Sequence, residues 1–476
     1  MKRYAQRDDA VTTLLAEAKD PHTPKKRLSI LAKEKNYVNV REAVAENTAS
    51  PATALQKLAC DWNVNVRCSV AENSKAPPDV LLKLAGDKDE TVRMAVAKNH
   101  NTPLKAFLLI LTTDQDVDLR IEMLGNCSLP QEVFRVLAKD ASSAVRKAFA
   151  VNPKAPVEAL LKLARDQDPK LRLIMAKERR MSPEILLTLA DDKSSEVREA
   201  IAIHDDAPQE ALLKLAGDPD EAVRRHVSRH HKLPPAALMK LAGDQVEAIR
   251  RDVAQNFFTP AAILQNLASD QDKEVRRYVA RHSNTPPAEV QHLAGDQDGE
   301  VRRNVAHHFS ASSDTLQKLA DDPDERVRRN VAENANTPPA ALQKLADDPD
   351  EDVRQNVAKH LKTLSATLQK LADDSDKVVR CYVAENTNTP SAALQKLAGD
   401  QDAMVRRKVA EHSNTPPAGL QQLAGDGDED VRILIAENPK TPLDALAVLI
   451  LEMNHDVQEV ALRAFQKRRR GVCNSA

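Results

Sequence analysis

Apolar and polar positions recur along this chain with a period of 26 residues. Residues 337–360, TPPAALQKLADDPDEDVRQNVAKH, contain most of one period, and residues 389–412, TPSAALQKLAGDQDAMVRRKVAEH, repeat the same frame. Leucine and alanine follow helical spacing in the first half, and valine and alanine do so in the second. Strand-like alternation is absent. Each period therefore predicts two short amphipathic helices joined by a turn.

A recurring arginine fixes the register, and we count positions within each repeat from this arginine as zero. It recurs every 26 residues from Arg41 to Arg432, with one spacing of 27 between Arg93 and Arg120, and a last degenerate copy has Gln458 instead. This gives about 17 repeats. Repeats of this length are typical of solenoids, in which each unit buries its apolar face only against its neighbours.

The repeats divide the chain without any linker. We expect an irregular N-terminal capping repeat at residues 1–40, tandem helical repeats at 41–457, and a degenerate C-terminal cap with a basic tail at 458–476. Proline at position +10 usually follows a small polar residue. Thr337 and Pro338 thus predict an N-cap and the first residue of a helix. Aspartates at +20 and +22 predict the cap of the second helix.

The motif TPPAALQKLADDPDEDVR resembles the leucine-rich repeat variant family, and the likeness covers nearly the whole chain. The resemblance implies an all-α, right-handed superhelical solenoid in which an α-helix alternates with a 3₁₀ helix. The proline-containing first helix is the candidate for the 3₁₀ element. A similar nitrogen-fixation-associated member has an N-terminal iron–sulfur segment. This chain lacks those cysteines, so we expect no such cofactor.

The recurring arginine falls on the buried arc of the second helix and therefore needs a partner. The aspartate column at +20 supplies one, and we predict a structural Arg–Asp ladder along the stack. Its predicted members include Arg224, Arg250, Arg276, Arg302, Arg328, Arg354, Asp244, Asp270, Asp296, Asp322 and Asp348. Paired carboxylates for acid–base chemistry or for calcium are the weaker interpretation of the same column.

Histidine and asparagine share position +6, which predicts a C-terminal cap that tolerates left-handed backbone. His226 and His230 are one helical turn apart and form the single pair suited to a metal. No hydrolase, metalloprotease or phosphate-loop motif is present. The sequence thus predicts no catalytic residue, no metal, no cofactor and no small-molecule substrate.

Positions +1, +2 and +5 change along the chain and lie opposite the buried arc. Early repeats carry apolar residues there, such as Ile121 and Ile174, and the last full repeat carries Ile433 and Leu434. Between them the columns turn basic and polar. The predicted partner-binding residues of a concave face are Arg225, Arg229, Arg251, Arg277, Tyr278, Arg281, Arg303, Asn304, Arg329, Asn330, Asn356, Tyr382, Arg407 and Lys408.

Concave solenoid faces bind extended partners, so we predict a non-enzymatic scaffold for a protein or peptide with an acidic surface. A nucleic acid held by the arginine-rich columns of repeats 8–15 is the alternative. A third interpretation is structural, in which the +1 arginines pair with acidic turns of adjacent repeats.

The net charge of the chain does not indicate a class of partner, because 69 basic residues nearly balance 71 acidic ones. Five scattered cysteines form no CxxC pair and indicate a reducing compartment. No apolar run approaches the length of a membrane span, and the N-terminal residues do not resemble a signal peptide. We therefore expect a soluble cytoplasmic protein without a membrane partner. The oligomeric state stays open.

Overall fold

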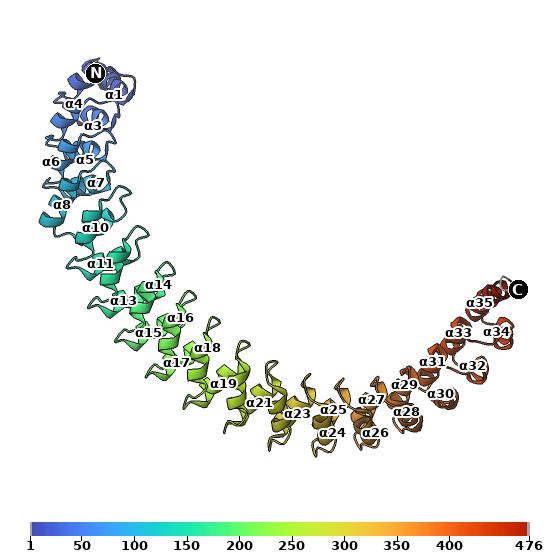
Figure 1. The fold of residues 1–476 in the computed structure, drawn as a ribbon. Coiled ribbons are helices and arrows are strands. Elements are labelled where there is room, and N and C mark those ends of the chain that lie inside the picture. Colours follow the sequence, from blue (N-terminus) through green and yellow to red (C-terminus); the bar gives the residue numbers. More distant parts are fainter. Residues whose placement is uncertain (1, 474–476) are drawn as a thin grey trace. The chain divides into compact units, whose positions relative to one another are not determined.

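A computed structural model describes residues 2–473, and within this range it contains 35 helices and no strand (Figure 1). The chain divides into two compact units, residues 1–237 and residues 238–476. The boundary falls inside α18 (Pro235–Leu241). Each unit is a stack of helical pairs, as the period predicts.

In the first unit, two helices alternate along the stack. The odd-numbered helices, most of which carry the arginine of position zero, are α1 (Lys2–Lys19), α3 (Val38–Glu46), α5 (Val64–Glu72), α7 (Glu90–Lys98), α9 (Val117–Met123), α11 (Ser143–Ala150), α13 (Pro169–Lys177), α15 (Ser195–Ala202) and α17 (Glu221–Ser228). The even-numbered helices are α2 (Lys25–Leu31), α4 (Ala52–Leu58), α6 (Pro78–Leu84), α8 (Leu104–Thr113), α10 (Gln131–Leu137), α12 (Val157–Leu163), α14 (Pro183–Leu189) and α16 (Gln209–Leu215).

The second unit continues the same alternation. Its odd-numbered helices are α19 (Glu247–Gln255), α21 (Lys273–Arg281), α23 (Gly299–His307), α25 (Glu325–Glu333), α27 (Glu351–Lys359), α29 (Lys377–Glu385), α31 (Ala403–Glu411), α33 (Glu429–Glu437) and α35 (His455–Cys473). Its even-numbered helices after α18 are α20 (Ala261–Leu267), α22 (Pro287–Leu293), α24 (Ser313–Leu319), α26 (Pro339–Leu345), α28 (Ser365–Leu371), α30 (Ser391–Leu397), α32 (Pro417–Leu423) and α34 (Leu443–Ile450).

The core lies between the two rows of helices and uses the predicted register. Val327, Val331 and Ala332 of α25 are fully buried, and Leu342 and Leu345 of α26 are almost fully buried. These are positions −1, +3, +4, +14 and +17, and the same columns are buried from repeat to repeat. Small valine and alanine side chains allow the odd-numbered helices to approach one another closely, so these pack on their successors more extensively than the even-numbered ones do.

Both helices of each repeat are α-helices, so the expected alternation with a 3₁₀ helix is wrong. In α26, Ala346 N–H donates to the Leu342 carbonyl over four residues (3.0 Å). Only the ends tighten, for example where Asp348 N–H donates to the Leu345 carbonyl over three residues (3.1 Å). The reason is the buried stripe at i, i+3 and i+4, which lies on one face only at the α-helical pitch.

The predicted cap at Thr337 is also wrong by one residue. The N-cap of α26 is Pro338, with extended backbone and no side-chain hydrogen bond. Thr337 is fully buried, and its hydroxyl donates to the carbonyl of Val331 on the preceding helix. The threonine therefore ties the end of one helix to the loop that follows, instead of starting the next helix.

The one irregular spacing in the sequence is absorbed locally. The extra residue between Arg93 and Arg120 lengthens α8, which has 10 residues where most even-numbered helices have seven. At the N-terminal end, α1 packs on α2 and α3, and at the other end α35 packs on α33 and α34. Residues 1 and 474–476, which belong to the two predicted caps, lie outside the described residues.

Candidate interaction surface

Between the two rows of helices, most position-zero arginines pair with the +20 aspartate of their own repeat, which precedes the next odd-numbered helix. Arg328 donates from Nε to Asp348 Oδ2 (2.6 Å) and from Nη2 to Oδ1 (3.0 Å). Its Nη1 donates to the backbone carbonyl of Asp322 (2.8 Å). The Asp348 side chain is only 4% exposed. Fork-to-fork pairing of this kind satisfies both charges and fixes the distance between neighbouring repeats.

The same pair recurs in both units at the predicted positions. In the second unit, the pairs are Arg250–Asp270, Arg276–Asp296, Arg302–Asp322, Arg328–Asp348, Arg354–Asp374, Arg380–Asp400 and Arg406–Asp426. Arg224 donates to the carbonyls of Asp218 and Pro219, and Asp244 accepts from the N–H of Val246. Burial alone would raise the pKa of Asp296, but hydrogen bonds from Arg276 and from the Asp298 N–H outweigh it and lower that pKa.

A second ladder, at position +6, joins the backbones of successive repeats. The Asn386 amide donates to the carbonyls of Ala358 (2.7 Å) and His360 (3.1 Å), and its oxygen accepts from the N–H of Asn388 (2.9 Å). The predicted C-cap is correct in position but not in conformation. Asn386 has φ −72° and ψ 122°, and no described residue, glycine included, has positive φ. The extended backbone at Asn386 places its side-chain amide within hydrogen-bonding distance of the previous repeat.

Histidine makes the same bridge at this position. His412 Nε2 lies 3.0 Å from the carbonyl of Asn386, and Nδ1 accepts from the N–H of Asn414 (3.0 Å). Burial lowers the pKa of His412, so the ring is held neutral with its proton on Nε2. His230 bonds in this way to His204, whereas His226 lies 2.8 Å from Glu199. The two candidate metal ligands thus face different partners.

The columns at +1, +2 and +5 lie outside both ladders, and together they form a surface that we call the odd-helix face. Residues at +1 and +2 are mostly half-buried and residues at +5 are mostly exposed. In Figure 1, the odd-numbered helices from α25 to α33 lie on the inner side of the second unit's curve, and the even-numbered helices from α26 to α34 lie on its outer side. In this unit, the odd-numbered helices that carry the variable columns therefore lie on the concave side.

Most of the +1 arginines are engaged by the aspartate that N-caps the next odd-numbered helix, at position +22. Arg277 holds Asp298 in a two-bond fork (2.8 and 2.7 Å), and Arg407 holds Asp428 in the same way (3.0 and 2.7 Å). Arg329 pairs with Asp350 and Asp352, and Arg251 approaches Asp272, while Arg303 pairs with Glu300 of its own helix. The +1 column therefore has the structural role that the sequence left open.

The other predicted binding residues differ in the contacts that they make and in their exposure to solvent. Asn304 and Asn330 donate to the carbonyls of Arg277 and Arg303 in the previous repeat, both at 3.2 Å. Lys359 lies over the ring of Tyr382, 5.5 Å from its centroid. Lys408 lies between Glu385 and Glu411. Asn356 and Tyr278 are half-buried, and Arg225, Arg229 and Arg281 are exposed.

Sequence reasoning did not identify the hollows between the odd-numbered helices. A hollow of about 350 Å³ lies between α31 and α33, lined by Met404, Ile433 and Leu434 together with paired Arg407 and Lys408. In the first unit, a hollow of about 380 Å³ between α9 and α11 is lined by residues such as Ile121, Leu124 and Val151. The signal was present in the sequence as apolar residues in otherwise polar columns.

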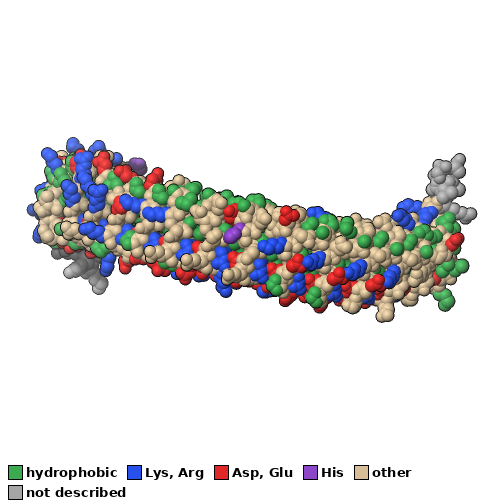
Figure 2. Space-filling view, turned by 60° about the horizontal axis from the view of Figure 1, so that its bottom comes forward, with side chains coloured by type: hydrophobic (Ala, Val, Ile, Leu, Met, Phe, Trp, Pro, Cys, Tyr) green, Lys and Arg blue, Asp and Glu red, His purple; other side chains and the backbone are tan. Residues whose placement is uncertain are grey.

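Charges of both signs are interleaved over much of the face shown in Figure 2. On the even-numbered helices of the second unit, lysines pair with aspartates of the preceding repeat, at Lys344–Asp321, Lys370–Asp347 and Lys396–Asp373. Within residues 2–473, no helix is both long enough and apolar enough to cross a membrane. This interleaved distribution of positive and negative charges differs from the broad positive surface that typically binds nucleic acid.

Comparison with known proteins assigns the repeat to a family. Residues 325–350 match the leucine-rich repeat variant. This segment is one full period, from the start of α25 to the aspartate that caps α27, and the same pattern recurs along the chain. The repeat of this chain is therefore similar to the leucine-rich repeat variant. None of the curated proteins matches this chain.

Two solved structures are similar to this chain. One is described as "a leucine-rich repeat variant with a novel repetitive protein structural motif". It has 29% identity and a TM-score of 0.35, over 46% of this chain and 87% of that chain. The other is a chain from a structure that concerns Kap95p binding to RanGDP. It has 12% identity and a TM-score of 0.27, over 95% of this chain and 76% of that chain.

Proposed function

We propose that this protein is a non-enzymatic scaffold whose odd-helix face binds an extended segment of a partner protein. The proposal rests on a division of labour among the columns. Positions −1, 0, +3, +4 and +6 hold the stack together in repeat after repeat. Positions +1, +2 and +5 vary, and a variable strip on an invariant frame is the arrangement by which solenoids recognise partners.

The single observation that carries the proposal is the contrast between paired charges and open apolar side chains on this face. Arg407 and Lys408 are held by carboxylates, while Met404 beside them is 51% exposed and shares a hollow with Ile433 and Leu434. Such a hollow fits one apolar side chain of a partner, and the surrounding ion pairs form a polar rim. An apolar anchor inside a polar rim is typical of protein–protein interfaces.

The charges in the exposed +5 column suggest the direction in which a segment would lie. In the second unit the column starts at Gln255 on α19, carries Arg281 and His307 on α21 and α23, alternates in sign through Glu333 and Lys359, and ends with Glu385, Glu411 and Glu437 on α29, α31 and α33. We therefore expect the bound segment to carry acidic residues near α21 and α23, and basic residues near its apolar anchor at α31. Complementary charge of this kind governs orientation and association rate more than affinity.

The nucleic-acid alternative is disfavoured by the same pairs. A phosphate backbone needs cations that are free to release counterions. Four of the +1 arginines in the second unit, at positions 251, 277, 329 and 407, face aspartates instead. Reversing Arg277 to glutamate would also place two carboxylates together at Asp298. A charge reversal in this column would therefore reduce both binding and stability, and the two effects could not be told apart. Substitutions in the apolar hollow avoid this problem.

The test is affinity capture from a lysate of the source organism, with and without nuclease, using the full-length chain. The variant Met404→Glu/Ile433→Arg/Leu434→Asn installs residues that occupy these columns in the repeat of α23, at Glu300, Arg303 and Asn304. It should keep its fold and lose capture of proteins retained by the unchanged chain. Retention of the same proteins by the variant would refute the proposal. Capture that disappears with nuclease would favour nucleic acid.

A further inference from the structure

The even-numbered helices present a second exposed surface, and it differs between the two units. At position +15 the first unit has Leu161, Leu187 and Leu213, whereas the second unit has mostly glutamine in the corresponding column, as at Gln343 and Gln369. Leu187 is 36% exposed and Leu213 is 39% exposed. None of these leucines is needed for the stack, because the second unit forms the same helices with glutamine.

A matching difference occurs one turn earlier, at position +12. The first unit carries glutamates in the first turns of α10, α12, α14 and α16, at Glu132, Glu158, Glu184 and Glu210. The second unit mostly has alanine in this column, as at Ala340 and Ala366. Among the described residues, none of the four glutamates forms an ion pair. We call the surface formed by these glutamates and leucines the even-helix face of the first unit.

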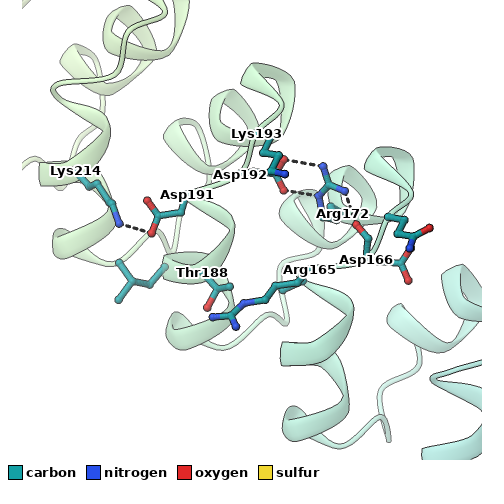
Figure 3. Close-up of a pocket in the computed structure, with 11 residues that line it drawn as sticks. Arg165, Asp166, Arg172, Thr188, Asp191, Asp192, Lys193 and Lys214 are labelled. Carbon is teal, nitrogen blue, oxygen red and sulfur yellow. Dashed lines mark hydrogen bonds and ion pairs between the residues drawn. The ribbon is translucent and has the colours of Figure 1, made fainter.

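A hollow of about 820 Å³ lies among α12, α14 and α16 of this face (Figure 3). Ala164 and Leu187 provide its apolar wall. Figure 3 shows Arg165 extending from the end of α12 toward Thr188 on α14. A second hollow of about 440 Å³ between α10 and α12 continues the surface, with Val157 in its wall.

The carboxylates that line the larger hollow already form ion pairs. Asp166 pairs with Arg146, Asp191 with Lys214, and Asp192 with Arg172. Two of the cations that line it, Arg165 and Lys193, are exposed and have no ion-pair partner within the described residues. The hollow therefore offers an apolar wall beside two uncommitted positive charges, and the free glutamates lie at the opposite ends of the same helices.

We propose that the even-helix face of the first unit binds an amphipathic helix of a partner protein, lying across α12, α14 and α16. Its apolar stripe covers Leu161, Leu187 and Leu213. Its carboxylates pair with Arg165 and Lys193 on one flank, and its lysines or arginines pair with the +12 glutamates on the other. The surface is separate from the odd-helix face, so this site does not depend on the function proposed above.

The repeat spacing favours a helix over an extended strand as the occupant. Packed helices in a stack lie on the order of 10 Å apart. A partner helix rises about 10.5 Å over seven residues and returns to nearly the same face. Side chains at every seventh position can therefore meet Leu161, Leu187 and Leu213 in turn. Three bands of acidic, apolar and basic residues also match the three sides of an amphipathic helix.

The test uses synthetic peptides and the full-length protein, with binding measured by fluorescence anisotropy. The probe is an amphipathic helical peptide with a leucine stripe, glutamates along one flank and lysines along the other. A second peptide has glutamine in place of leucine, and a third has lysines on both flanks. We expect the probe to bind, and the two other peptides to bind at least tenfold more weakly.

Two protein variants locate the binding. The variant Leu161→Gln/Leu187→Gln/Leu213→Gln takes the residues of the second unit and should weaken probe binding at least tenfold. The variant Arg165→Glu/Lys193→Glu should weaken the probe and strengthen the peptide with lysines on both flanks, which a folding defect cannot produce. The odd-helix variant Met404→Glu/Ile433→Arg/Leu434→Asn should bind the probe unchanged. The proposal is overturned if the unchanged protein does not bind the probe, or if neither even-helix variant alters binding.

Discussion

The two units have the same interior and different exteriors. Arg172 and Asp192 in the first unit make the same fork as Arg328 and Asp348 in the second, with the Asp side chain 3% and 4% exposed. On the even-numbered helices, however, leucine and glutamate in the first unit correspond to glutamine and alanine in the second. The comparison teaches that the stack is specified by a few buried columns, so the exposed columns are free to carry recognition.

The largest expected effect comes from breaking the buried ladder in either unit. Arg328→Ala leaves the carboxylate of Asp348 buried without its partner, and loss of one member of a buried pair costs about 3–5 kcal/mol. Arg172→Ala should cost about as much in the first unit. Urea denaturation of each variant measures the change. The matched control is Arg329→Ala, whose pairs are part-exposed and should contribute less than about 1 kcal/mol. Equal losses in the free energy of unfolding for Arg328→Ala and Arg329→Ala would mean that the position-zero and +1 arginines stabilise the stack to the same extent.

The next largest effect is expected in the +6 ladder. Asn386→Ala removes the donor shared by the carbonyls of Ala358 and His360 and should cost about 1–3 kcal/mol. Asn386→His should cost less, because histidine makes the same bridge at His412. Hydrogen exchange of amides in α27 and α29 locates the loss. A histidine variant no better than alanine would show that the two residues are not equivalent here.

Acid should weaken the second unit more than the first. Burial lowers the pKa of His308, His360 and His412 below the ordinary 6.5, and in the first unit it does so for His230. As pH falls below 6.5, the unfolded chain binds protons that the folded histidines do not, so the free energy of unfolding decreases. The decrease is about 1.4 kcal/mol for each unit by which a folded pKa lies below its unfolded value.

Hydrogen exchange at pH 7 and pH 5 measures this difference between the units. Replacing His308, His360 and His412 by asparagine, the residue of neighbouring repeats, should flatten the response of the second unit. Aspartates of the ladder respond in a separate range, because their pKa values are lowered from 3.8 and their stabilisation is lost only at more acidic pH. An unchanged response in the triple variant would assign the acid effect to other groups.

The smallest effect is expected from exchanging exposed residues between the units. Leu187→Gln and Gln343→Leu each place a residue that the other unit carries at the same position, so stability should change by no more than about 0.5 kcal/mol. Thermal denaturation measures it. A loss several times larger at Leu187 would mean that this leucine supports the stack, which would weaken the case for a binding role.

The period and register were predictable because burial acts on every repeat in the same way. Arg328 falls on the apolar arc of α25 and therefore needed an acid, and Asp348 was the recurring choice. Thr337 was misplaced because a threonine before proline satisfies the rules for an N-cap, yet its hydroxyl bonds backward to Val331. Local sequence shows which groups need partners, but here the partner was decided by packing.

The candidate surface was harder to predict for the same reason. Arg277 and Arg281 have the same chemistry in the sequence, but only Arg277 lies within reach of Asp298 in the following repeat. The hollow between α31 and α33 depends on how two helices approach, which no single repeat encodes. Column analysis predicted which positions face outward, and only the stacked geometry distinguishes paired arginines from exposed ones.

The reach of each arginine into the turn before the next odd-numbered helix has a consequence for the growth of the chain. A duplicated 26-residue segment brings one arginine and one aspartate, and wherever it is inserted within the array, each finds a counterion at once. Lengthening by whole periods is therefore electroneutral and leaves no orphaned charge at the junction. Insertion of a partial period would separate the two, so selection on the genome should favour gains and losses of complete units.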